Sequence, residues 1–384
     1  MPVARWTPPG EVGRSAAYGA FAGADQLRID RAAFGISVAE ARSLDPQQRL
    51  VLRVGYGVLL GSRGGSTSPF GGATLRDALT NSAVGVFVGV EASGLAAAVG
   101  ELGVFSTSGG ALSITSGRLS YTLGLVGPCY SVDTACASAL AALHVCACAV
   151  GVGGECDEGV GMGTKVLSEA SNYATSAGGM TSPHGRCHTF DRRADGYCRG
   201  EGCGAFLVSS PAGWRAGVAR SVLSLVGSAV QQDGPSASLT APNGSSQRRL
   251  LETVRRAIPE GGVPILEAHG TGTALGDPIE VTRAALLEGR WSDSLDRAVA
   301  VCRLAPRTGP SLCVRGRPRL VGLLREGAAG RCSARRSSRT WATWRRRRRP
   351  RVSRRSRWGR CRRRSSSSTR SCGGATGVRR HPRG

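Results

Sequence analysis

Positive charge gathers at one end of this 384-residue chain, and this limits how much of the sequence can fold. The chain has 51 basic and 26 acidic residues, but 27 arginines and only one acid, Glu326, lie after residue 300. Residues 1–300 therefore carry 24 basic and 25 acidic groups and are close to neutral. The net charge of +25 describes the last 84 residues, so it gives no reason to class residues 1–300 as a nucleic-acid-binding domain.

The sequence after residue 300 does not have the composition of a folded domain. Its stretch WATWRRRRRPRVSRRSRWGRCRRRSSSS has no apolar periodicity, so it cannot bury a core. We therefore predict a folded domain over residues 1–300 and a disordered, Arg-rich, low-complexity tail over residues 301–384. Two other interpretations of the tail stay open. In the first, the arginines interleaved with tryptophans form an electrostatic arm that binds nucleic acid. In the second, the stretch is an out-of-frame translation of a GC-rich gene, which would explain why it contains no Lys, Asn, Ile or Tyr.

Several classes of protein are disfavoured by features that the sequence lacks. It has no run of about 18 or more apolar residues, so we expect no membrane span. The opening MPVARWTPPGEVGR has no apolar signal region, so we expect an intracellular, cytoplasmic protein. The 13 cysteines form no C-x-x-C pair, which favours separate thiols over a disulfide framework. We expect no metal site and no bound cofactor.

Short apolar runs alternate with helical patterns along the first 300 residues. Strands are predicted where apolar residues follow one another, and helices where they recur every three to four residues. The predicted strands are 83–90, 130–132, 205–208, 222–230 and 263–268, and the predicted helices are 112–125, 137–150, one from Asp45-Pro46 and one from Pro278. This alternation predicts an α/β domain with a buried sheet.

A cysteine stands where a predicted strand gives way to a predicted helix, in GPCYSVDTACASALAALHV. We expect the N–H groups at this helix start to be unpaired, so that together with the helix dipole they stabilise a thiolate and make Cys136 reactive. Its small neighbours Ala135, Ala137 and Ser138 leave room for a substrate carbonyl. Strand–turn–helix geometry is typical of acyl-transfer nucleophiles, although an inert buried cysteine fits the same pattern.

A second segment, VPILEAHGTGTALGDPIE, places a histidine at the end of a predicted strand. His269 is followed by a glycine-rich loop that carries Thr271 and Thr273, whose hydroxyls can bind a ligand. Asp277-Pro278 then begins a helix. A histidine at this place in an α/β domain is either part of a site or a satisfied core residue.

These segments resemble the β-ketoacyl synthase (ketosynthase) family of polyketide and fatty acid synthases. Five segments follow one another in the family's order over about residues 17–290: FGISVAEARSLDPQQRL, SGRLSYTLGLVGPCYSVDTACASAL, GMTSPHGRCHTFDRRADGYCRGEGCGAFLV, SAVQQDGPSASLTAPNG and EAHGTGTALGDPIE. The resemblance implies a thiolase-like layered αβαβα fold of two related halves, usually assembled as a homodimer.

The resemblance also implies a chemistry. Cys136 matches the cysteine that takes an acyl group from the phosphopantetheine thioester of an acyl carrier protein, before decarboxylative condensation with a malonyl-type extender. His269 matches the first of two catalytic histidines. Thr271 and Thr273 match positions that meet the pantetheine arm. The implied role is acyltransferase chemistry in polyketide or fatty acid biosynthesis.

The chain departs from the family pattern after residue 290. The family's second histidine and a lysine follow the HGTGT segment, but here no lysine follows Lys165 and the only later histidine is His381. A late Gly-Phe-Gly-Gly turn is also missing. We therefore predict an incomplete second half, poor acylation and no condensation, because each missing group costs on the order of 10²-fold or more in rate. The alternatives are a catalytically dead ketosynthase-like module for dimerisation or carrier binding, and nucleic-acid binding through the tail.

Overall fold

The computed structural model describes residues 15–63, 75–94, 103–151, 153–210, 223–238, 241–258, 265–285, 298–302 and 308–315. From residue 316 onward the predicted disordered tail, and with it the proposed nucleic-acid arm, lies outside the described residues. Within the stretch for which disorder was predicted, Thr308–Arg315 forms strand β8, which pairs with one strand on each side. The domain boundary at residue 300 stays a prediction.

One sheet has the order β2-β1-β3-β4. It consists of β1 (Val84–Val90), β2 (Cys129–Val132), β3 (Glu158–Lys165) and β4 (Gly202–Ser209). Strand β1 is parallel to β2 and β3, whereas β4 runs antiparallel to β3. All residues of β1 are buried, which is why the sequence shows it as a continuous apolar run. The strands predicted at 83–90, 130–132 and 205–208 are confirmed.

Strand β3 was not predicted, because its sequence EGVGMGTK gives every second position to glycine. The structure supplies the reason. A Cβ at Gly161 would lie 2.7 Å from Leu143 Cδ1, and a Cβ at Gly163 would lie 2.4 Å from Ala139 Cβ. Both neighbours belong to α7 (Ser138–Val150), which therefore packs directly on the β3 backbone.

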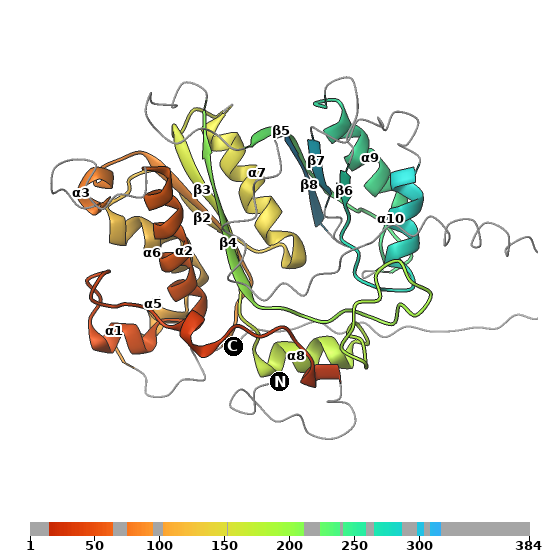
Figure 1. Ribbon diagram of the computed structural model, residues 1–384, viewed down its shortest axis with the longest axis horizontal. Coiled ribbons are helices and arrows are strands. Elements are labelled where there is room, and N and C mark those ends of the chain that lie inside the picture. The colour runs from red at the N-terminus through yellow and green to blue at the C-terminus, as the bar shows by residue number, and fades with distance from the viewer. Residues whose placement is uncertain are drawn as a thin grey trace, which may run out of the picture. The chain divides into compact units, whose positions relative to one another are not determined.

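A second sheet has the order β5-β8-β7-β6. It joins β8 to β5 (Ser224–Gln232), β6 (Ile265–Glu267) and β7 (Ala298–Cys302). Strands β6 and β7 are parallel, and β8 is antiparallel to both of its neighbours. Helix α7 contacts β1 and β3 of the first sheet and β5 and β8 of the second, so it lies between the two sheets (Figure 1). The strand predicted at 222–230 is confirmed as β5, and the strand predicted at 263–268 is confirmed over Ile265–Glu267, whereas residues 222, 263 and 264 lie outside the described residues.

Helices cover the outer faces of both sheets. Helices α2 (Pro46–Ser62) and α6 (Leu112–Leu123) pack on the first sheet, and α9 (Gly244–Arg255) packs on the second and contacts α10 (Gly276–Ala285) (Figure 1). The other helices in the described part of the chain are α1 (Val38–Ser43), α3 (Leu75–Leu79), α5 (Ser106–Gly110), α8 (Glu169–Ala177) and the 3-10 turns η2 (Ser15–Ala17), η3 (Ala24–Leu27) and η4 (Ala135–Ala137). The order helix, sheet, α7, sheet, helix is the layered αβαβα arrangement expected from the sequence. Among the described helices, none has both the length and the apolar character needed to cross a bilayer.

Helix α2 begins where the sequence predicts. Asp45 caps it by accepting a hydrogen bond from the Gln47 N–H at 2.7 Å, with proline in the first turn. The buried amide of Gln47 then donates to the Glu91 carbonyl and accepts from the Val166 N–H, both at 3.0 Å. One side chain thus fixes α2 against the carboxyl ends of β1 and β3. This is the edge of the first sheet at which the candidate site lies.

Candidate active site

The predicted nucleophile lies on a strained turn between β2 and α7. Cys136 is the middle residue of η4, and its side chain is exposed. Ala135, just before it, has φ +53°, in the left-handed region that a residue with a Cβ adopts at a cost of roughly 1–2 kcal/mol. Strained backbone of this kind is held in place by its surroundings and is common at functional sites.

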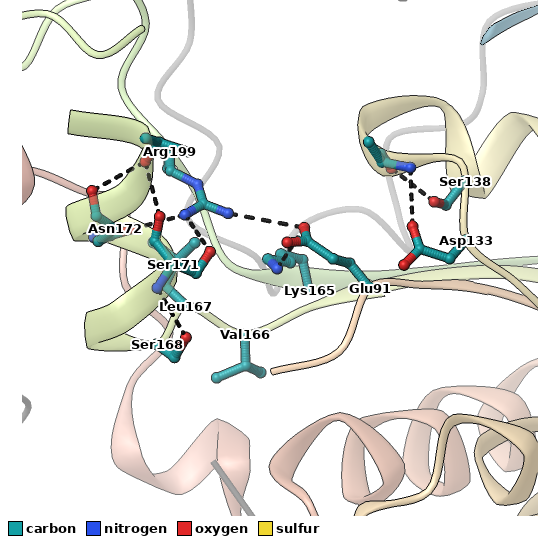
Figure 2. A network of polar contacts seen from close by, with 12 residues as sticks. Glu91, Asp133, Ser138, Lys165, Val166, Leu167, Ser168, Ser171, Asn172 and Arg199 are labelled. Carbon is teal, nitrogen blue, oxygen red and sulfur yellow. Dashed lines mark hydrogen bonds and ion pairs between the residues drawn. The ribbon is translucent and has the colours of Figure 1, made fainter. Parts of the chain in front are cut away.

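Hydrogen bonds clamp this turn. The Ser138 hydroxyl accepts from the Thr134 N–H at 2.8 Å and donates to the Ala135 carbonyl at 2.7 Å, and Asp133 accepts from the Ala135 N–H at 3.0 Å (Figure 2). The expectation that the N–H groups at this helix start are unpaired is therefore wrong for Thr134 and Ala135. The turn uses both of these donors to hold its own shape.

The start of α7 lies against the sheet with almost no space between them. A Cβ at Gly89 of β1 would lie 2.3 Å from the Ser138 carbonyl carbon and oxygen. Only glycine permits that approach. The glycine near the end of β1 therefore fixes where the cysteine turn begins, a role that was not predicted from the sequence.

The loop after β6 is held by two carboxylates near the start of α10. Glu280 accepts hydrogen bonds from the N–H groups of His269 at 2.9 Å and Gly270 at 2.8 Å, and Asp277 accepts from the Gly272 N–H at 3.0 Å. Gly270 and Gly272 have φ of +56° and +72°, which explains the glycines of the HGTGT segment. The Glu280 carboxyl is buried, and this burial raises its pKa to about 7, against the effect of the two N–H donors.

The two predicted substrate-binding threonines lie side by side in this loop. The hydroxyls of Thr271 and Thr273 are 3.0 Å apart, and Thr273 also accepts from the Gly276 N–H at 3.1 Å. Both side chains are half-buried. Each hydroxyl keeps further hydrogen-bonding capacity, so the pair can still meet a polar arm of a substrate.

The TFDRRADGY segment connects the HGTGT loop to the cysteine region. Thr189 donates its hydroxyl to the Gly270 carbonyl at 2.7 Å, and Gly196 donates its N–H to the Gly272 carbonyl at 3.0 Å. Phe190, with φ +57°, donates its N–H to Asp277 at 2.6 Å. The next residue after Gly196 is Tyr197. The glycine loop and this segment thus form one hydrogen-bonded unit.

Tyr197 brings this unit near the nucleophile. Burial raises the pKa of Tyr197, the nearby Arg199 lowers it, and negative charge on Cys136 and on Glu91 raises it further. Tyr197, which ends the TFDRRADGY segment, therefore lies within electrostatic range of Cys136. That the Cys136 thiol and the His269 imidazole face one cavity stays a prediction.

A charged network missed in the sequence lies beside these residues. Glu91, directly after β1, accepts from the Lys165 ammonium at 2.7 Å and lies 3.9 Å from the Arg199 guanidinium, which also donates to Ser171 at 2.6 Å and Asn172 at 3.0 Å (Figure 2). The signal for it in the sequence is a carboxylate at the end of a fully buried parallel strand. Such strand ends are where α/β domains gather functional groups.

Other polar residues have local roles. Asp191 accepts three hydrogen bonds from Arg193, which lowers the pKa of this carboxyl to about 2, and His184 lies 3.9 Å from Asp195. His144 forms a hydrogen bond with the Ser228 hydroxyl at 2.8 Å. Within the described ranges, no three His, Cys, Asp or Glu side chains are grouped to hold a metal ion.

Family models match most of the described chain. The model of the β-ketoacyl synthase N-terminal domain matches residues 3–212, and that of the C-terminal domain matches residues 222–309. The boundary between the two matches falls between β4 and β5. The first match therefore holds the cysteine turn, and the second holds the HGTGT loop.

Curated relatives include large polyketide synthases. A mycocerosic acid synthase-like polyketide synthase of Mycolicibacterium smegmatis is 36% identical over 304 residues, which is 75% of this chain and 14% of the relative. A protein of the spectinabilin polyketide synthase system of Streptomyces orinoci is 41% identical over 265 residues, 67% of this chain and 7% of the relative. The chain thus spans less than a fifth of the length of these relatives.

Solved ketosynthase structures are similar in fold. The ketosynthase from module 6 of the bacillaene synthase of Bacillus subtilis 168 has a TM-score of 0.61 at 28% identity, over 74% of this chain and 49% of that one. The oxazolomycin ketosynthase domain of Streptomyces albus has a TM-score of 0.63 at 28% identity, over 81% and 54%.

Proposed function

This chain belongs to the β-ketoacyl synthase family as a ketosynthase domain of the polyketide synthase type, and we propose that Cys136 is its acyl acceptor. The observation that carries the proposal is the cysteine turn: an exposed thiol on a strained, hydrogen-bonded turn at the start of a helix. In the proposed step the thiol loses its proton and its sulfur attacks the carbonyl carbon of an acyl thioester. The carrier thiol then leaves with a proton, and the acyl group stays on Cys136.

His269 and the two threonines are proposed to serve the substrate. The imidazole would donate a hydrogen bond to the thioester carbonyl of a malonyl-type extender as CO₂ departs, where negative charge develops on that oxygen. Thr271 and Thr273 would bind the pantetheine arm that an acyl carrier protein delivers. Glu280 supports this role, because it holds the backbone of His269 and Gly270 in place.

The missing residues limit the proposed reaction. No lysine follows Lys165, and His381, the only later histidine, lies outside the described residues. The extender half of the reaction in this family uses a second histidine, so we propose slow acylation of Cys136 and no condensation by this chain. An acyl carrier protein and a second copy of the chain are the proposed partners.

The experiment separates acylation from condensation. The full chain is incubated with an acyl N-acetylcysteamine thioester, and the peptide that contains Cys136 is examined by mass spectrometry. We expect slow acylation of that peptide, no acylation after Cys136→Ala, and unchanged acylation after Cys129→Ala, which removes another exposed thiol. Acylation that persists at the same rate and at other sites in Cys136→Ala would overturn the proposal, and so would rapid elongation with a malonyl thioester.

A non-catalytic role is the second candidate, favoured by the same missing lysine and histidine. The chain would then be a ketosynthase-like module that dimerises or binds a carrier protein. Cys136→Ala should leave association unchanged in sedimentation experiments, and an acyl thioester should give no adduct. A stoichiometric acyl adduct on Cys136 excludes this candidate.

A further inference from the structure

A second thiol–imidazole pair lies on α7, remote from the cysteine turn. His144 Nε2 is 3.7 Å from Cys148 Sγ, one helical turn further on, and His144 Nδ1 is 2.8 Å from the Ser228 hydroxyl of β5. Cys148 is exposed, whereas His144 and Ser228 are half-buried. Cys148 lies ten residues after the first residue of α7, or about 15 Å along the helix axis, and Cys136 precedes that first residue, so the pair does not belong to the candidate active site.

Cys148, His144 and Ser228 have the arrangement of a nucleophilic site, in which a base contacts the nucleophile and a third group orients the base. An imidazole within hydrogen-bond reach of a thiol can take its proton, and a third group on the other ring nitrogen fixes the orientation and tautomer of the ring. When His144 Nδ1 donates to the Ser228 hydroxyl, the Nε2 lone pair is directed at Cys148. Burial lowers the pKa of His144, which keeps the ring neutral and able to accept a proton near neutral pH.

We propose that Cys148 is a second reactive thiol, which α,β-unsaturated carbonyl compounds modify with His144 as the base and Ser228 as the group that orients it. The S–H bond breaks and its proton passes to His144 Nε2, while the sulfur bonds to the β-carbon of the electrophile. The electron pair of the carbon–carbon double bond moves towards the carbonyl, and the α-carbon takes a proton from the imidazolium. The addition needs no oxidant and releases no leaving group. It is independent of the function proposed for Cys136.

The test uses N-ethylmaleimide on the folded full chain. The rate of modification of each cysteine is read from its peptide by mass spectrometry, and Cys129, an exposed thiol on β2, serves as the internal reference. At pH 7 we expect Cys148 to react roughly tenfold faster than Cys129, since the thiolate is the nucleophile and a base supplies it. His144→Gln should bring Cys148 within about twofold of the reference, and Ser228→Ala should give a smaller loss.

A pH series distinguishes a base from a packing residue. In the unmodified chain the Cys148 rate should level off once His144 is neutral, and burial lowers the pKa of His144. The rate at the reference thiol Cys129 should keep rising with pH over the same range. His144→Gln should restore the rising profile at Cys148, and its unfolding midpoint shows whether it remains folded. Equal rates at the two thiols in the unmodified chain, or a Cys148 profile unchanged in folded His144→Gln, would overturn the proposal.

Discussion

Substitution of Gly89 tests whether the contact between β1 and α7 positions the cysteine turn. The added Cβ of Gly89→Ala would lie 2.3 Å from the Ser138 carbonyl carbon and oxygen and 2.5 Å from the Ala139 nitrogen. Ordinary contact begins near 3.4 Å, so the start of the helix must retreat by about 1 Å. Overpacking costs about 1–3 kcal/mol, and backbone that cannot rotate away favours the upper end. Alanine regains about 0.5–1 kcal/mol over glycine in a strand, which leaves a net loss of about 2 kcal/mol.

The assay is urea unfolding followed by circular dichroism. Gly204→Ala is the matched control, because this glycine lies in β4 of the same sheet and its Cβ would meet no atom within 4 Å. We expect Gly89→Ala to lower the free energy of unfolding by about 2 kcal/mol and Gly204→Ala to leave it unchanged or slightly higher. Iodoacetamide labelling of Cys136 should also change in the first variant alone. If the two variants unfold at the same urea concentration, the close approach does not determine where the turn lies.

Three further substitutions test the contacts around the site. Because the folded state raises the pKa of Glu280 to about 7, its protonated form favours folding below the unfolded pKa near 4.5, and this stability is lost as pH rises through 7. Glu280→Gln should remove this pH dependence of the free energy of unfolding, which amounts to at most about 3 kcal/mol between pH 4.5 and 8. If the pH dependence is unchanged in the variant, another group causes it. Ser138→Ala should lower the free energy of unfolding by about 1–2 kcal/mol in thermal unfolding, because it removes the two hydrogen bonds of this hydroxyl. Ser43→Ala should cost about 0.5 kcal/mol or less, because its exposed hydroxyl bonds within its own helix. Equal unfolding midpoints for the two variants would show that the Ser138 hydroxyl does not hold the cysteine turn. Glu91→Gln should cost about 1–3 kcal/mol in urea because it leaves two partly buried cations without their carboxylate, whereas Glu252→Gln, which breaks an exposed pair, should cost at most about 0.5 kcal/mol.

Apolar runs made much of the fold predictable from the sequence. The run at 83–90 is a strand because burial on both faces demands an apolar residue at each position, and Asp45-Pro46 begins a helix because capping chemistry is local. Strand β3 was not predicted because its glycines are required by the close packing of α7 on the strand. That packing is a tertiary contact, which no local sequence pattern shows. Strand β8 was not predicted because it lies at the start of the arginine-rich sequence that we predicted to be disordered. In the structure it pairs with β5 on one side and β7 on the other.

The residues of the candidate site also divide into those that the sequence predicted and those that it did not. Cys136 and His269 were predicted because each follows a strand in a recognisable local motif, and Thr271 and Thr273 because they share the second motif. The groups that hold these motifs in shape were not predicted. Glu280 binds backbone N–H groups eleven and ten residues away, and Glu91 binds Lys165 across 74 residues of sequence. Such pairings depend on how the chain folds back, and no local pattern records them.

The contacts that shape the HGTGT loop bear on why condensation should fail. Asp277 and Glu280 hold this loop through the N–H groups of His269, Gly270 and Gly272, and Thr189 reaches it from the other side. All of these residues precede 286, so the departures from the family pattern that follow do not remove any of them. A chain that still holds its loop but lacks the later histidine and lysine should fail at extender decarboxylation while acyl transfer to the cysteine continues. The same chain should therefore accumulate an acyl adduct that a malonyl thioester does not discharge.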